Sequence, residues 1–129
     1  MRKTTTIFFV IIFLALCGQS IGKNDELQKQ YLDKLRDINF KLTLAHNHLS
    51  YETSTNEMRK INQQIDVLNK DKSDLKLDAL KYYKGKLPQQ LLSKWEDEEI
   101  EYNKGTEKAD RRIRERNREL EKQIRELKK

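Results

Sequence analysis

The side chains that most often carry out chemistry in proteins are scarce in this chain of 129 residues, which has one cysteine, Cys17, and two histidines, His46 and His48. Histidines two positions apart on a helix point about 200° away from each other, so they cannot bind one metal ion from the same helix face. The sequence also contains no G-x-S-x-G serine motif and no glycine-rich phosphate loop. We therefore expect no metal site, no cofactor and no nucleophilic catalysis.

Four consecutive acids at positions 96–99 (EDEE) are the one place where paired carboxylates could act as general acid and base. They follow Trp95 in a stretch with the apolar spacing of a helix, where a run of acids ordinarily forms a solvated face. We interpret the run as solvated, and we expect neither enzymatic activity nor a small-molecule substrate.

A cluster of basic side chains lies in residues 111–118 (RRIRERNR). Its arginines are Arg111, Arg112, Arg114, Arg116 and Arg118. Clustered cations attract sulfate and phosphate groups, so one candidate partner is an extracellular polyanion, such as a heparin-like chain, or an anionic membrane surface. The alternative interpretation, which we favour, is a solvated helix face whose charges have no partner.

Two large apolar residues, Phe40 and Leu44, lie roughly opposite Leu42 on a predicted helix. Aromatic and aliphatic groups outside a core often anchor protein interfaces, which makes this pair a candidate binding site for a protein partner. The other interpretation is that the helix contacts two neighbours and therefore needs a wide apolar arc. We favour the wide arc.

The element that organises the chain is residues 58–83, where apolar residues recur every seven positions. This series is Ile61, Leu68, Leu75 and Tyr82, interleaved with Met58, Ile65 and Ala79, and Lys72 is its one polar member. Alternate spacings of three and four place such side chains on one side of a helix. The pattern predicts a helix that packs against other helices.

Three helices are predicted, over residues 25–49, 55–83 and 88–128. Asn24 or Asp25 can cap the first, and Ser54 with Glu57 forms a capping box for the second. Gly85 and Pro88 mark the end of the second helix and the start of the third.

The apolar arc of the second helix widens after Leu75, which predicts contact with two neighbours. The added members are Leu77, Leu80 and Tyr83. Two neighbours imply three packed helices rather than a hairpin, and we expect Trp95 of the third helix to be a core anchor.

Past Gly105 the chain becomes strongly charged, and its few apolar residues form a thin stripe. The stripe is Ile113, Leu120, Ile124 and Leu127, and Ala109 is the one other apolar residue of the segment. Opposite charges three or four positions apart, each pair contributing about 0.2–0.5 kcal/mol, support a solvated helix. We expect the third helix to extend beyond the other two and to favour self-association through its apolar stripe.

The N-terminal segment resembles a secretory signal peptide. Arg2 and Lys3 precede an apolar run at positions 7–17 that is too short to span a bilayer, and small residues follow up to Gly22. We expect cleavage after Gly22 and secretion. The alternative is a lipid-anchored surface protein, because residues 14–18 (LALCG) resemble a bacterial lipobox around Cys17, with Leu16 where that motif has a small residue.

The composition agrees with this organisation, since 37% of the residues are charged and the chain has four glycines and one proline. The predicted fold is all-α: an antiparallel three-helix bundle or coiled coil with an extended charged C-terminal helix, after a cleaved N-terminal signal peptide. Its segments are 1–22 (signal peptide), 23–106 (helical bundle) and 107–129 (charged extension). The function we expect is that of a secreted, basic, non-enzymatic interaction protein. Its partner would be another protein or a second copy, with a polyanion as the alternative and intracellular nucleic acid not expected.

Overall fold

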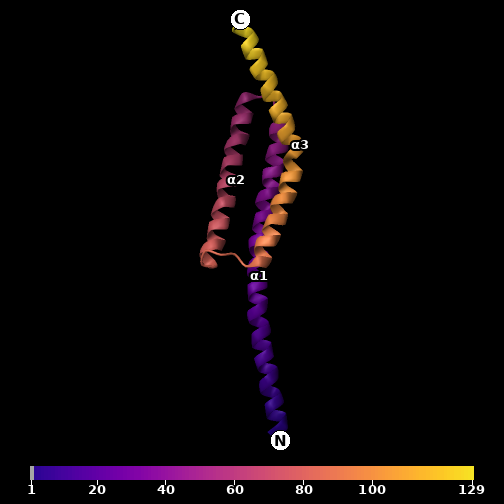
Figure 1. Ribbon diagram of the computed structural model, residues 1–129, viewed down its shortest axis with the longest axis vertical. Coiled ribbons are helices and arrows are strands. Elements are labelled where there is room, and N and C mark those ends of the chain that lie inside the picture. Colours follow the sequence, from indigo (N-terminus) through magenta and orange to yellow (C-terminus); the bar gives the residue numbers. More distant parts are fainter. Residues whose placement is uncertain (1) are drawn as a thin grey trace.

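The computed structural model describes the backbone of residues 2–129 and the side chains of residues 24–129. It contains three helices, α1 (Arg2–Tyr51), α2 (Thr55–Tyr82) and α3 (Gln89–Leu127), and no strand in the described part of the chain. Successive helices run in opposite directions (Figure 1). The prediction of an all-α helical bundle is confirmed. The predicted signal peptide, its cleavage after Gly22 and the alternative at Cys17 lie outside the residues whose side chains are described.

The boundaries between helices follow from local hydrogen bonds. Ser54 is the N-cap of α2, and its hydroxyl accepts a hydrogen bond from the backbone N–H of Glu57 at 3.5 Å. The carboxylate of Glu52 accepts from the backbone N–H groups of Ser54 and Thr53, at 3.0 and 3.1 Å. Both hydrogen bonds lower the pKa of Glu52 from its ordinary value, and the one from Ser54 has the larger effect. The predicted capping role of Ser54 is confirmed, but the capping box with Glu57 is not formed, because the Ser54 N–H donates to Glu52 instead. Asn24 and Asp25 lie inside α1 rather than at its start.

The end of α2 differs from the prediction in one residue. The N–H of Gly85 donates to the carbonyl of Leu80 at 2.7 Å, and that of Lys84 donates to Lys81 at 3.2 Å, which is the pair of bonds that closes a Schellman motif. The first left-handed residue is therefore Lys84, with φ 56°, and Gly85 follows it with φ 93°. The prediction that Gly85 ends the helix in a left-handed conformation is confirmed, and Lys84 is a second left-handed residue that the sequence did not predict.

The core has α1 at its centre. This helix packs against both α2 and α3, whereas no Cα atom of α2 lies within 8 Å of one in α3 in the described residues. One apolar cluster, the first cluster, contains Leu32, Leu35, Leu75, Ala79, Leu87, Leu91 and Trp95. The second cluster contains Leu42, Ala45, Leu49, Ile61 and Ile65.

The buried side chains confirm one prediction and correct another. Trp95 is 3% exposed, as expected for a core anchor. The predicted widening of the apolar arc of α2 is wrong for Leu77, which is 53% exposed, and Tyr82 of the seven-residue series is also exposed, at 59%. The helix between two neighbours is α1, because it lies between α2 and α3 and must present apolar side chains to both.

The C-terminal part of α3 extends beyond the other helices (Figure 1). Arg116 lies level with the end of α1, and the helix continues from there to Leu127, a rise of about 16 Å. Leu120, Ile124 and Leu127 in this segment are 45%, 52% and 86% exposed. We call residues 118–127 the projecting end of α3.

Candidate functional site

A group of interacting polar side chains, buried or partly buried, comes from all three helices. We call it the polar layer. Its members are Asn39 and His46 of α1, Lys72 of α2, and Glu99, Tyr102 and Asp110 of α3. Along their helices, Asn39, Lys72 and Glu99 fall between the first and second clusters, whereas Ile38 packs against both clusters.

One half of the polar layer is centred on Glu99. Its carboxylate oxygens each accept a hydrogen bond from Lys72 at 3.2 Å, and Oε1 also lies 3.4 Å from the donating amide nitrogen of Asn39. The ammonium of Lys72 is 4.0 Å from the centroid of the Tyr102 ring, a cation–π contact. The pair Lys72–Glu99 therefore joins α2 to α3, whose backbones do not touch.

In the other half of the polar layer, a carboxylate, an imidazole and a phenol are neighbours in space, with the imidazole in the middle. Nδ1 of His46 lies 2.9 Å from Asp110, although it is not aligned for a hydrogen bond, and Nε2 lies 3.2 Å from the Tyr102 hydroxyl. Burial, and then the charges of Asp110 and Glu99, raise the pKa of Tyr102, which favours the protonated phenol. A protonated phenol is a weak nucleophile, which makes this group better suited to joining α1 and α3 than to covalent catalysis.

The acids at positions 96–99 divide between the surface and the bundle. Glu98 pairs with Arg36 and Glu99 with Lys72, and both acids are partly buried, whereas Glu96 and Asp97 are exposed. The interpretation of the whole run as a solvated face is wrong for Glu98 and Glu99, because their helix face turns toward α1. Only one feature of the sequence indicated the polar layer, namely the polar residue Lys72 in an otherwise apolar series.

The five clustered arginines do not share one face. Nη1 of Arg116 donates to the backbone carbonyls of Leu49 and Glu52, at 2.7 and 3.0 Å. The guanidinium of Arg112 lies 4.6 Å from the centroid of the Tyr51 ring. These two arginines therefore bind the C-terminal end of α1.

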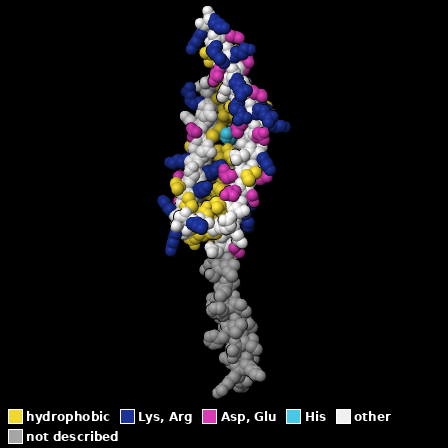
Figure 2. Space-filling model, in the orientation of Figure 1, with side chains coloured by type: hydrophobic (Ala, Val, Ile, Leu, Met, Phe, Trp, Pro, Cys, Tyr) yellow, Lys and Arg dark blue, Asp and Glu magenta, His cyan; other side chains and the backbone are white. Residues whose placement is uncertain are grey.

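The remaining arginines of the cluster, Arg111, Arg114 and Arg118, are exposed. Arg111 makes a salt bridge of 3.2 Å with Glu107, one turn earlier. Figure 2 shows Lys and Arg side chains gathered over the upper part of the molecule, which includes this part of α3.

The outer apolar pair on α1 is also exposed. Phe40 is 62% and Leu44 is 53% exposed. The interpretation that they extend a buried arc is therefore wrong, because α2 and α3 cover the other side of α1. Their role as a binding site stays a prediction.

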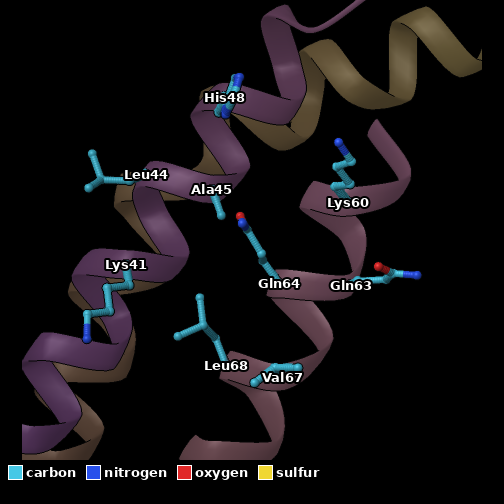
Figure 3. Close-up of a pocket in the computed structure, with 9 residues that line it drawn as sticks. All are labelled: Lys41, Leu44, Ala45, His48, Lys60, Gln63, Gln64, Val67 and Leu68. Atoms are coloured by element: carbon cyan, nitrogen blue, oxygen red, sulfur yellow. The ribbon is translucent and has the colours of Figure 1, made fainter. Parts of the chain in front are cut away.

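Leu44 also borders an open groove of about 740 Å³ between α1 and α2 (Figure 3). Ala45 and Leu68 point between the two helices, and the exposed side chains of Leu44 and Val67 lie at the margin of the groove. The polar side chains around the groove are Lys41, His48, Lys60, Gln63 and Gln64. The groove has no cluster of acid or base groups that would suggest catalysis.

The part of the chain whose side chains are described offers neither a metal-binding cluster nor a membrane-spanning helix. Residues 24–129 contain no group of three or more histidine, cysteine or acidic side chains arranged to hold a metal ion. No helix within these residues has an apolar stretch long enough to cross a membrane.

The chain matches no protein family model, no curated protein and no solved structure. The fold and surface define the class of this protein as an all-α helical bundle with exposed apolar and basic surfaces.

Proposed function

We propose that this protein is a non-enzymatic helical interaction protein that associates with a second copy of itself through the projecting end of α3. The observation that supports this proposal is the exposed stripe of Leu120, Ile124 and Leu127. Spacings of four and three place these side chains on one helix face. It is the same face on which Ala109 is buried and Ile113 packs against the second cluster.

The stripe is thus a continuation of the α1–α3 interface past the point where α1 ends. A second copy of the projecting end, lying antiparallel to the first, would occupy the position that a longer α1 would have taken. With Leu120 of one copy opposite Leu127 of the other, Glu121 and Lys128 of the two copies lie within about 3 Å of each other along the helix axis. Both flank the stripe on the same side, so the antiparallel arrangement pairs opposite charges twice.

The size of the contact sets the expected strength. Only three apolar residues per copy are involved, so the buried surface is below the roughly 1,200 Å² of a standard stable interface. We therefore expect reversible association that depends on protein concentration, in the micromolar range or weaker.

Sedimentation velocity over a wide concentration range tests the proposal. The wild-type protein should shift from monomer to dimer, and the double variant Leu120→Gln/Ile124→Gln should stay monomeric. Both positions lie on the projecting end, so circular dichroism should show unchanged helix content. The matched control Phe40→Gln/Leu44→Gln alters the exposed face of α1 and should dimerise like wild type. A wild-type protein that is monomeric at every concentration, or a stripe variant that still dimerises, would contradict the proposal.

We also propose that the protein is exported and that residues 1–22 are its cleaved leader. The support is the sequence pattern of Arg2 and Lys3, the apolar run and the small residues before Lys23. Mass spectrometry of the protein isolated from its native source tests this directly. A free N-terminal Lys23 agrees with secretion, a lipid on Cys17 indicates an anchored surface protein, and an intact Met1 would contradict both.

A further inference from the structure

A regular row of cations runs along the face of α3 that points away from α1. Its members are Lys104, Arg111, Arg118 and Arg125, each seven positions from the next and all exposed. Seven residues are nearly two helical turns, so these side chains line up at intervals of about 10.5 Å over roughly 32 Å. We call these four residues the basic row.

More cations lie close to this line than acids do. Three or four positions from members of the basic row, and so about 50° from it around the helix axis, lie five further exposed cations: Lys108, Arg114, Lys122, Lys128 and Lys129. The exposed acids at the same spacings number four: Glu101, Glu107, Glu115 and Glu121. Glu107 is 3.2 Å from Arg111, and Glu101 is 3.8 Å from Lys104. These exposed pairs are screened by water and salt, so they compete weakly with a polyanion.

We propose that the basic row binds a linear sulfated polysaccharide, an activity that goes beyond protein contacts and does not depend on self-association. A straight row of evenly spaced cations matches a linear chain with evenly repeated anionic groups, and each ion pair releases counterions. The apolar stripe lies on the opposite side of α3. A dimer formed through the stripe would therefore leave both basic rows accessible.

Two other polyanions fit this face less well. Proteins that bind single-stranded nucleic acid stack its bases on aromatic side chains, and residues 103–129 contain none. A helix that lies on an anionic membrane buries its apolar face in the bilayer surface. Here that orientation would point the basic row away from the head groups, because Leu120 and Ile124 lie on the other side of the helix.

The structure also separates this row from the arginine cluster seen in the sequence. Arg112 and Arg116 hold the end of α1 and are partly buried, so they are not members of the binding face. Lys104 and Arg125 lie outside residues 111–118 yet complete the row. The relevant variant is therefore Lys104→Gln/Arg111→Gln/Arg118→Gln/Arg125→Gln, the row variant.

The experiment measures the Kd for heparin by calorimetry at two salt concentrations. If four ion pairs form, tripling the salt from about 50 mM should weaken wild-type binding about 20-fold, taking a slope of about −0.7 per charge. The row variant should bind at least about tenfold more weakly at low salt and show a smaller salt dependence. The control Lys34→Gln/Lys70→Gln/Lys76→Gln/Lys81→Gln removes the same charge from exposed positions on α1 and α2 and should bind like wild type.

The outcomes distinguish this inference from the proposed function. An unchanged Kd in the row variant, or an equal loss in the control, would overturn the assignment of the site. Tighter binding of single-stranded RNA or of phosphatidylserine vesicles than of heparin would overturn the ligand class. The stripe variant Leu120→Gln/Ile124→Gln should keep its heparin affinity per chain, and the row variant should still dimerise, so each proposal can fail alone.

Discussion

Arg116 should stabilise the bundle, whereas its neighbour Arg118 should not, although the two lie in the same basic cluster. Nη1 of Arg116 donates to the carbonyls of Leu49 and Glu52 at 2.7 and 3.0 Å. These are carbonyls at and just past the end of α1, where a cation also interacts favourably with the helix dipole. Arg118 is exposed and belongs to the basic row.

The expected cost of Arg116→Ala follows from these contacts. A hydrogen bond to a charged group contributes about 1.5–3 kcal/mol, and the helix dipole adds about 0.3–1 kcal/mol. Both bonds share one nitrogen, and water can reach the carbonyls after truncation, so the lower values apply. We expect a loss of about 2 kcal/mol in the free energy of unfolding, which lowers Tm by about 8 °C in a chain of this size. Arg118→Ala should change the free energy of unfolding by less than about 0.5 kcal/mol.

Urea unfolding followed by circular dichroism at 222 nm measures both effects. The Arg116→Ala midpoint should fall with an unchanged m value, and Arg116→Lys should recover only part of the loss, because an ammonium lacks the planar geometry of guanidinium. Equal stability of the Arg116→Ala and Arg118→Ala variants would refute the reasoning. It would mean that the two carbonyl contacts contribute nothing beyond what water supplies.

Three further predictions concern the backbone and the turns. Gly105→Ala should raise the free energy of unfolding by about 0.5–1 kcal/mol, because alanine favours a helix more than glycine does. The added Cβ would lie 3.8 Å from the Thr43 side chain, which is an ordinary contact. A lower urea midpoint in the variant would contradict this prediction. Lys84→Gly should raise the free energy of unfolding by about 0.5–1 kcal/mol, because φ at this position is 56°. An unchanged urea midpoint would show that the turn carries no strain. The hydrogen bond from the backbone N–H of Ser54 to its carboxylate lowers the pKa of Glu52 in the folded protein. The stabilisation that ionised Glu52 gives the fold is therefore complete above its ordinary pKa of 4.5, and it is lost as the pH falls through the lower pKa of the folded state. Tm measured from pH 6 to 3 should therefore fall less steeply in Glu52→Gln than in wild type, and parallel curves would count against this role.

The helices of this protein are determined largely by the sequence itself. The seven-residue series around Leu68 and Leu75, the cap at Ser54 and the turn near Gly85 are local signals, because helix periodicity and capping depend on residues within a few turns of each other. The helix boundaries predicted from them agree with the structure within one or two residues at the starts and ends of α2 and α3. Even the spacing of the basic row was present in the sequence.

Only the tertiary structure decided which faces of those helices are covered. Phe40 and Leu77 satisfy the same apolar criterion as buried residues, yet both are exposed, because no neighbouring helix reaches them. Lys72 and Glu99 are 27 positions apart, and their pairing depends on the relative placement of α2 and α3. Likewise, Arg116 is distinguished from Arg118 by the position at which α1 ends. The periodicity of a sequence indicates which side chains share a helix face. The free energy gained by burying that face depends on which part of the protein packs against it.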